Sequence, residues 1–292
     1  MPLFGAHMSI SGGLHNAISA ATELGCETLQ LFTKNANQWN AKPITDDEVR
    51  TFRRALIDSN LKFPTAHDSY LINIASPDDA AYKKSISAFI HELERAEALG
   101  LSYLVMHPGA HTGSGEEAGL MRAIAAFDEI HARCPGFQTM VLIETTAGQG
   151  TTLGYRFEHV AAIRNGVKQP ERLGVCLDTC HVFAAGYALG SEEEYKETFD
   201  QFHKAIGLEN LKLFHLNDSV KPFNSRVDRH AAIGRGAIGL EPFRRLVNDS
   251  RFQNLPMILE TPKENDDGEP MDPVNLGILR GLLRTKAVAS PG

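Results

Sequence analysis

The sequence predicts an α/β protein folded as a single barrel of eight parallel strands, with a metal site where the strands end. Three observations support this prediction. Short apolar runs rich in strand-forming residues recur eight times, segments with helical periodicity separate them, and a polar residue follows nearly every run. Eight strand-helix units favour a closed (β/α)8 barrel over an open doubly wound sheet.

The eight apolar runs are the expected strands, and they are spread over the whole chain: Leu3 to Ala6, Thr28 to Phe32, Lys62 to Ala66, Tyr103 to Met106, Met140 to Ile143, Gly174 to Leu177, Leu211 to Phe214, and Pro256 to Leu259. The segments between them carry helix signals. Ser76-Pro77 opens one predicted helix, whose apolar residues from Ile86 to Leu99 share one face before Gly100 ends it. Capping-box spacing predicts two further helix starts: Thr45 with Glu48, and Ser191 with Glu194.

Polar residues of metal-binding types follow seven of the runs: His7, His67, His107, Glu144, Asp178, His215 and Glu260. The carboxyl ends of parallel strands gather at one face, so these side chains should converge there. A single histidine in such a place is usually only hydrogen-bonded, and a single aspartate often caps the next helix. The whole set would be costly to bury without cations. We therefore expect a divalent metal cluster.

Two further segments add candidate ligands. His181 lies three residues after Asp178, and Asp228 and His230 lie two apart, so in an extended segment they point the same way while Arg229 points elsewhere. The candidate set then has nine members: His67, His107, Glu144, Asp178, His181, His215, Asp228, His230 and Glu260. Imidazoles mixed with carboxylates favour zinc first, and manganese or iron second. Nine ligands suit two or three ions. Cys180 is discounted as a ligand.

Length and composition suggest one globular domain. The 292 residues are 42% hydrophobic and 22% charged without a linker-like stretch, so we expect one domain over residues 1–286 and a short tail over 287–292. The amino terminus has no signal-peptide pattern and no apolar run reaches a membrane-spanning length, which predicts a cytoplasmic protein with no membrane partner. The four cysteines are expected to be thiols. A net charge of -7 argues weakly against indiscriminate nucleic-acid binding.

Several strings resemble endonuclease IV proteins: HDSYLIN at 67–73, HPGAH at 107–111, ETTAGQG at 144–150, GVCLDTCHVFAAGY at 174–187, HLNDS at 215–219, SRVDRH at 225–230 and LET at 259–261. The match keeps the family's order over nearly the whole chain. The resemblance implies a TIM barrel, a trinuclear zinc cluster and cleavage of duplex DNA on the 5′ side of abasic sites, with 3′-end trimming as a second activity. It places the enzyme in base excision repair.

The resemblance also implies a ligand assignment. One zinc would be held by His67, His107 and Glu144, and the second by Asp178, His215 and Glu260 with Glu144 shared; the third would be held by His181, Asp228 and His230. A hydroxide formed because zinc lowers the pKa of water from about 15.7 to about 7 would attack phosphorus. Glu144 and Glu260 would be catalytic, with Glu260 orienting the nucleophile, and the products would be a 3′-hydroxyl and a 5′-deoxyribose phosphate.

On the DNA side, the resemblance assigns Tyr70 and Leu71 to a wedge that exposes the lesion. Asn37 stands where some relatives have arginine, so Gln38 or Trp39 would share its role. Other positions also depart from the family pattern: Ala231, Ala232 and Arg235 stand where relatives tend to be more polar or acidic, and Asn224 replaces a frequent glycine. Basic loop residues are candidate phosphate contacts: Lys34, Lys221, Arg226 and Arg229. The expected partner is double-stranded DNA with abasic sites or blocked 3′ ends, bound by a monomer.

Two other functions compete with this interpretation. A divalent-metal sugar isomerase or epimerase on the same barrel would also gather histidines and carboxylates at strand ends, but it would not need the third set formed by His181, Asp228 and His230. A protein that binds damaged DNA without cutting it would have no use for an activated water. Manganese remains an alternative to zinc.

Overall fold

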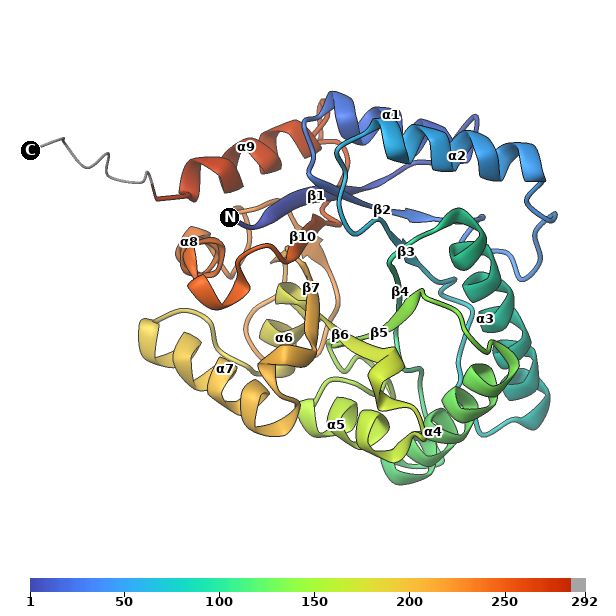
Figure 1. Cartoon of the computed structure of the whole chain (residues 1–292). Helices are drawn as coiled ribbons and strands as arrows, with labels where there is room; N and C mark the ends of the chain where they lie inside the picture. Colours follow the sequence, from blue (N-terminus) through green and yellow to red (C-terminus); the bar gives the residue numbers. More distant parts are fainter. Residues whose placement is uncertain (285–292) are drawn as a thin grey trace, which may run out of the picture.

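The computed structural model describes residues 1–284, and these form a closed eight-stranded barrel surrounded by helices (Figure 1). Neighbouring strands around the barrel are β1, β10, β7, β6, β5, β4, β3 and β2, and β2 pairs with β1 to close it. Every pairing in the barrel is parallel. The predicted TIM barrel is therefore confirmed, including its closure.

The barrel strands are β1 (Leu3–Met8), β2 (Thr28–Phe32), β3 (Thr65–His67), β4 (Tyr103–Met106), β5 (Met140–Glu144), β6 (Leu173–Asp178), β7 (Leu211–His215) and β10 (Pro256–Leu259). The helices are α1 (Leu14–Glu23), α2 (Asp46–Asp58), α3 (Asp79–Leu99), α4 (Glu116–Arg133), α5 (Phe157–Gly166), α6 (Thr179–Ala185), α7 (Glu192–Ala205), α8 (Leu240–Asn248) and α9 (Asp272–Leu282). Short 3-10 turns cover Pro170–Arg172, Leu208–Asn210 and Ser250–Phe252.

The hydrophobic core has two parts, one inside the barrel and one between the strands and the helices. The inner part is small: Val105, Leu142, Cys176, Leu213 and Ile258, with Tyr103 and Met140 against it. The outer part is much larger and includes most of the buried phenylalanines. Because side chains alternate between the two faces of a strand, β4, β5, β6, β7 and β10 contribute to both parts. The inner part fills the barrel beneath the strand ends, so the polar residues that follow it face the barrel mouth.

Local sequence signals set several element boundaries. The capping boxes of α2 and α7 are both formed, and Gly100 ends α3 in the left-handed conformation that glycine adopts without strain. Two predicted boundaries were wrong. The helix expected at Ser76-Pro77 begins at Asp79, because the Asp78 side chain accepts the hydrogen bond from the Ala81 backbone and acts as its cap. The strand expected from Lys62 begins at Thr65, after Phe63 at a φ of 50° and a proline that cannot donate to a ladder.

A second, two-stranded sheet was not predicted. β8 (Asp218–Ser219) and β9 (His230–Ala231) pair antiparallel and close the loop after β7 at its base. Asp218 holds the segment that follows β9, because its carboxylate accepts hydrogen bonds from the backbones of Gly236 and Ile238. This small sheet fixes where the Asp228 and His230 segment starts and returns.

The remaining sequence-based expectations concern the chain as a whole. The four cysteines are free, as expected. Over residues 1–284, no helix combines the length and the apolar character needed to cross a membrane. The single domain over residues 1–286 stays a prediction, and the tail expected at 287–292 lies outside the described residues.

Candidate metal centre

Strand periodicity aims the candidate ligands at the barrel mouth. Five of them lie two residues after a member of the inner core, so they continue the same face of the strand: His107 after Val105, Glu144 after Leu142, Asp178 after Cys176, His215 after Leu213, and Glu260 after Ile258. The inner core therefore forms the floor of the site, and the next layer toward solvent is made of imidazoles and carboxylates.

The first predicted set meets at one carboxylate oxygen. The Nε2 atoms of His67 and His107 each lie 3.1 Å from Oε2 of Glu144. His67 and Glu144 are buried, whereas the side chain of His107 is 31% exposed. All three place ligand atoms within 4.8 Å of one another, a spacing that one cation can bridge.

The second predicted set surrounds Nδ1 of His215. This atom lies 2.8 Å from Oε1 of Glu144, 3.2 Å from Oε2 of Glu260 and 4.0 Å from Oδ2 of Asp178. Glu144 thus contacts the first set with one oxygen and the second with the other, as a shared carboxylate would. Asp178 also caps α6, because its Oδ1 accepts from the His181 backbone. The capping and the metal-binding interpretations of Asp178 are compatible, since each uses a different oxygen.

The third predicted set is brought together by the loop between β8 and β9. The two carboxylate oxygens of Asp228 lie 3.1 Å from Nε2 of His181 and 3.2 Å from Nε2 of His230. Both nitrogens are buried, and within residues 1–284 neither has a hydrogen-bond partner, because the contacts with Asp228 are short but poorly directed. Asp178 lies near as well, with Oδ2 at 3.7 Å from His230. Buried nitrogens that converge on a carboxylate without hydrogen-bonding to it are arranged as ligands of a common cation.

The histidines are oriented by hydrogen bonds from their other ring nitrogen. Nδ1 of His67 donates to the carbonyl of Asp68, that of His181 to Thr145, and that of His230 to Glu260. A carbonyl oxygen can only accept, so it keeps the proton on Nδ1 and leaves Nε2 toward the cluster. His215 is turned the other way round, with Nδ1 toward the cluster.

Charge pairing dominates the electrostatics of the cluster. Burial raises the pKa of Glu144, but the charges of His215 and His107 outweigh burial and hold the pKa well below its usual range. Burial likewise raises the pKa of Glu260, but the charges of His215 and His67 and the hydrogen bond with His7 together lower it below its usual range. Burial lowers the pKa of His67, but the hydrogen bond and charge of Glu144 raise it to about 10. Protons on the imidazoles thus neutralise the carboxylates in the places where bound cations would do so.

The donor set and the orphaned nitrogens together fit a multinuclear metal site of imidazole and carboxylate ligands. Cys176 also lies within reach of Glu144 and His215, and Cys180 of Asp228 and His230. Burial raises the pKa of the Cys176 thiol well above its usual range and that of Cys180 to about 12, which disfavours the thiolate that binds metal. Cys180 instead donates weakly to the carbonyl of Arg229.

Sequence reasoning missed two polar residues that bind the candidate ligands. Gln30, on β2, contacts His215, Glu260 and His7. Asn217 donates to Oδ2 of Asp178 and accepts from the Glu260 backbone. Gln30 could have been found, because it lies two residues after Thr28 on a strand whose inward face enters the same layer. An amide is not among the usual ligands of zinc, so a search for zinc-ligand types passed over it.

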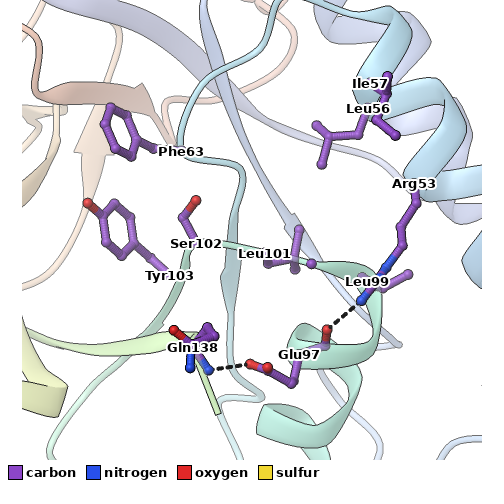
Figure 2. Close-up of a pocket in the computed structure, with 11 residues that line it drawn as sticks. Arg53, Leu56, Ile57, Phe63, Glu97, Leu99, Leu101, Ser102, Tyr103 and Gln138 are labelled. Atoms are coloured by element: carbon purple, nitrogen blue, oxygen red, sulfur yellow. Dashed lines mark hydrogen bonds between the residues drawn. The ribbon is translucent and has the colours of Figure 1, made fainter. Parts of the chain in front are cut away.

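The pockets give a contrast between the two ends of the barrel. A pocket of ≈440 Å³ opens beside the cluster, between His7, Phe32 and Lys263. A larger one of ≈590 Å³ lies at the opposite end, where strands β3 and β4 begin (Figure 2). Figure 2 shows it lined by leucines and by Phe63 and Tyr103, with Glu97 accepting from the Gln138 backbone. This second pocket is remote from every candidate ligand and brings no titratable cluster together, so the mouth remains the candidate site.

Known proteins similar to this chain show the family to which it belongs. A family model described as a xylose isomerase-like TIM barrel matches residues 18–282. A protein of Chloroflexus aurantiacus named probable endonuclease 4 is 53% identical over 284 residues, 97% of this chain and 99% of the relative. The chain belongs to the endonuclease 4 family. Endonuclease IV from Thermus thermophilus superposes with a TM-score of 0.83 at 35% identity, covering 96% of this chain and 98% of that one. The match at residues 18–282 and these relatives confirm the resemblance drawn from the sequence strings.

The sugar-isomerase alternative rests on the fold alone. A D-tagatose 3-epimerase-like protein superposes with a TM-score of 0.73 but is 17% identical, over 96% of each chain. Identity at that level reports the shared barrel and nothing about the reaction. The endonuclease 4 relatives decide between these two interpretations, because they are far more similar over the same length.

Beside the candidate metal centre, the candidate wedge lies on the loop after β3. Tyr70 is 61% exposed, and its ring lies 5.5 Å from Phe32 and 5.6 Å from His67 between centroids. Leu71 is half-buried, and Asn37 and Gln38 are exposed on the neighbouring loop. The two loops are joined, because Ser69 Oγ donates to the carbonyl of Ala36. The wedge and the probing residues therefore form one rim.

Lys34 occupies a different place from the one expected of a phosphate contact. It is buried, with Nζ 2.8 Å from Oε1 of Glu92 and donating to the carbonyl of Gln38. Arg95, one turn further along α3, donates to the carbonyls of Thr33 and Lys42. Lys34, Glu92 and Arg95, named here the α3 clamp, hold the loop from inside, so the position of Lys34 argues against direct contact with DNA.

The other basic candidates remain near the mouth. Arg229 and Lys221 are exposed, and Arg226 is half-buried with its guanidinium 4.0 Å above the ring of Tyr155. Arg226 and Asn224 both have positive φ, of 56° and 58°. Asn224 stands where glycine would avoid that strain, which gives a structural meaning to this departure from the family pattern.

Proposed function

We propose that this chain is a metal-dependent endonuclease that hydrolyses the phosphodiester on the 5′ side of abasic sites in duplex DNA. The observation that carries the proposal is the convergence of nine ligand-type residues at the barrel mouth of an endonuclease 4 family member. The products would be a 3′-hydroxyl and a 5′-deoxyribose phosphate. Removal of blocked 3′ ends is the same bond cleavage at a strand terminus, so one site serves both activities.

Three zinc ions are the proposed cofactor, with manganese as a substitute. His67, His107 and Glu144 would hold the first; Asp178, His215 and Glu260 the second, with Glu144 shared; and His181, Asp228 and His230 the third. When bound, the ions would supply an activated water near neutral pH and would neutralise charge on the phosphate and the leaving oxygen. The pairwise contacts near 3 Å within each set support this assignment.

The two catalytic carboxylates have different surroundings and so different proposed roles. Glu144 is 1% exposed and contacts His67, His107 and His215, so its part is to hold the ligand sets in register. Glu260 is 14% exposed and lies at the mouth beside the ≈440 Å³ pocket lined by His7. It is ionised, because its pKa is lowered, and it can accept a hydrogen bond from an attacking water and orient it toward phosphorus.

The rim loops supply the proposed DNA contacts. Tyr70 and Leu71 would occupy the gap left by the missing base, and an exposed aromatic ring beside the metal centre is suited to that contact. Asn37 and Gln38 would probe the strands from the adjacent loop, and Arg226 and Arg229 would contact phosphates. The proposed partner is duplex DNA carrying an abasic site or a blocked 3′ end, bound by a monomer.

The test combines metal content with cleavage. The purified protein should hold three divalent ions by elemental analysis and should cut a duplex with one abasic analogue while leaving the intact duplex uncut. His230→Gln should lower both the ion count and the rate, whereas His203→Gln, on the exposed side of α7, should change neither. A folded, active protein with one ion per chain would overturn the trinuclear assignment, and equal cutting of both duplexes would overturn the lesion specificity.

A further inference from the structure

Gln30 is a buried amide at the centre of the second ligand set. It lies on β2, is 0% exposed, and sits beside His7 in the register of β1 and β2. Its Nε2 is 2.5 Å from Oε1 of Glu260 and 2.9 Å from Nδ1 of His7, and its Oε1 is 2.8 Å from Nε2 of His215. One side chain therefore links two proposed ligands from β7 and β10 to a third strand.

His215 differs from the other oriented histidines in what holds it. His67, His181 and His230 donate to backbone carbonyls, which can only accept, so their ring orientation follows from the fold. His215 is held by an amide, which presents a donor at one end and an acceptor at the other. Its orientation is fixed only if the amide itself is fixed.

Glu260 fixes the amide. A carboxylate can only accept, so the end of Gln30 that lies 2.5 Å from it must be the NH₂ group. The second N–H then points to His7, whose Nδ1 accepts it. The carbonyl end is left for His215, which must donate from Nε2. The orientation of the Gln30 amide therefore depends on Glu260, and the position of the His215 proton depends on Gln30.

We propose that Gln30 is a positioning residue that keeps the proton of His215 on Nε2, turns Nδ1 toward the cation and holds Glu260 in place. This inference rests on the proposed function, since it concerns how the metal centre is built. Gln30 is assigned neither as a ligand nor as a DNA contact, and it acts through its hydrogen bonds with His215 and Glu260. It acts on the second ligand set and leaves the sets around His107 and Asp228 to their own contacts.

The size of the effect follows from the behaviour of partners that orient metal ligands. Their loss typically costs about 10–100-fold in metal affinity or activity. Gln30→Met keeps the length of the side chain and removes its hydrogen bonds, so it should weaken one ion of the cluster by that factor. The turnover number should fall while KM for the abasic duplex stays the same, because Gln30 lies beneath the ligands. Excess zinc should restore part of the rate.

A matched control is available two residues earlier on the same strand. Thr28 is also 0% exposed and shares the inward face, but it bonds to the Phe63 carbonyl and no candidate ligand. Thr28→Val therefore reports the cost of losing a buried hydrogen bond on β2. The experiment compares parent, Gln30→Met and Thr28→Val for zinc retained against a chelator series, and for the melting temperature of each metal-free protein.

The expected result is weaker retention of one ion in Gln30→Met alone, with both variants showing a cooperative melting transition in the metal-free form. Equal zinc retention and equal turnover in Gln30→Met and the parent would overturn the inference while leaving the proposed function standing. A parent protein that retains no divalent ion would overturn both.

A measurement on the unaltered protein keeps the inference testable if Gln30→Met fails to fold. Nitrogen-15 chemical shifts of the histidine rings in the zinc-loaded parent distinguish a metal-bound nitrogen from a protonated one. His215 should bind through Nδ1 with Nε2 protonated, whereas His67, His181 and His230 should show the reverse. A His215 that binds zinc through Nε2 would contradict the role given to Gln30.

Discussion

The two halves of the metal centre are built in different ways. The strand half comprises the residues that end a barrel strand or come directly after one: His67, His107, Glu144, Asp178, His215 and Glu260. The loop half comprises His181, from the first turn of α6, with Asp228 and His230 from the segment that ends at β9. Glu144 at the centre of the strand half is 1% exposed, whereas Asp228 in the loop half is 40% exposed. The barrel strands position the first half, whereas α6 and the segment that ends at β9 position the second half.

Because of this difference, the strand half bears the electrostatic cost of crowded carboxylates, whereas the loop half completes the ligand set of the third ion. The strand half cannot avoid crowding its carboxylates, because strand periodicity places them in one layer above the inner core. In the loop half, the segment of Asp228 and His230 is positioned mainly through the two-residue pairing of β8 with β9 and through Asp218, and the side chain of Asp228 is 40% exposed. We therefore expect the strand half to control catalysis and the loop half to control how firmly the third ion is held.

The largest expected effect lies in the strand half. Glu260→Gln keeps the shape of the side chain but removes the charge that orients the nucleophile, so cleavage of abasic duplex should fall by about 10² or more. Binding to abasic duplex and the melting temperature should change little. Glu193→Gln, on the exposed face of α7, is the matched control. Cleavage by Glu260→Gln near the parent rate would remove Glu260 from the mechanism.

The next effect tests the loop half by metal removal. Asp228→Asn removes the charge of the carboxylate that lies within 3.2 Å of Nε2 of both His181 and His230, so the third ion should be lost to a chelator at roughly 10-fold lower concentration than in the parent. The other two ions should be retained. Asp200→Asn, an exposed aspartate of α7, provides the control. Simultaneous loss of all three ions would show that the two halves are not independent.

A smaller effect is expected at the rim, outside both halves. Replacing Tyr70 and Leu71 with glycine should weaken selection of abasic over intact duplex by about 10-fold, because the wedge compensates part of an unstacking cost of a few kcal/mol. Cleavage of a flexible single strand should be unaffected, and the ion count should not change. Ile57→Ala, an exposed apolar residue at the other end of the barrel, controls for surface effects. Equal losses on all three DNAs would contradict the wedge.

The smallest effect is a pH dependence of the metal-free protein. Burial lowers the pKa of His230, but the charge of Asp178 and the contact with Asp228 raise it to about 9, and the pKa of His67 is raised to about 10. A histidine whose folded pKa is raised contributes stability that is complete below about 6.5 and is lost as pH passes its folded value. The melting temperature should therefore fall between about pH 6.5 and 10, by about 2–4 °C per kcal/mol lost.

The same titration distinguishes the halves. His230→Gln should remove the part of the decline that ends near pH 9 and keep the part that His67 contributes up to about 10. Zinc binds deprotonated ligands, so the loaded protein should not show the decline. A flat profile in the metal-free parent would show that the imidazolium-carboxylate pairs do not stabilise the fold.

The ligands of the strand half could be predicted from the sequence more fully than those of the loop half. Ligands of the strand half follow directly from a period of two, since each inward core residue is followed two positions later by a ligand type, as Leu142 is by Glu144. For the loop half, the sequence predicted only that Asp228 and His230 point the same way. The path of this segment depends on the pairing of β8 with β9, and strands of two residues are too short to be predicted from sequence. Gln30 was missed because its function is visible only through its contacts.

Lys34 was expected to contact a phosphate, but its ammonium group is buried in an ion pair with Glu92. A basic residue on a loop predicts a solvent-facing charge, and nothing local indicates that Glu92, on helix α3, lies 2.8 Å away. The pairing of Lys34 with Glu92 depends on how α3 packs against the loop, and this packing cannot be predicted from residue type alone. The start of β3 was missed for a related reason, since the positive φ of Phe63 is imposed by its surroundings on a residue that rarely adopts it.

The α3 clamp has a consequence for protein engineering. Glu92 and Arg95 hold the loop of Asn37 and Gln38 from beneath, and Ser69 ties that loop to the one that carries Tyr70. Residues 33–42 therefore cannot be replaced on their own by the corresponding loop of a relative. A chimera that imports this loop from a relative with another lesion preference must import the matching side chains of α3 as well, or the transplanted loop will leave a buried carboxylate without its counter-ion.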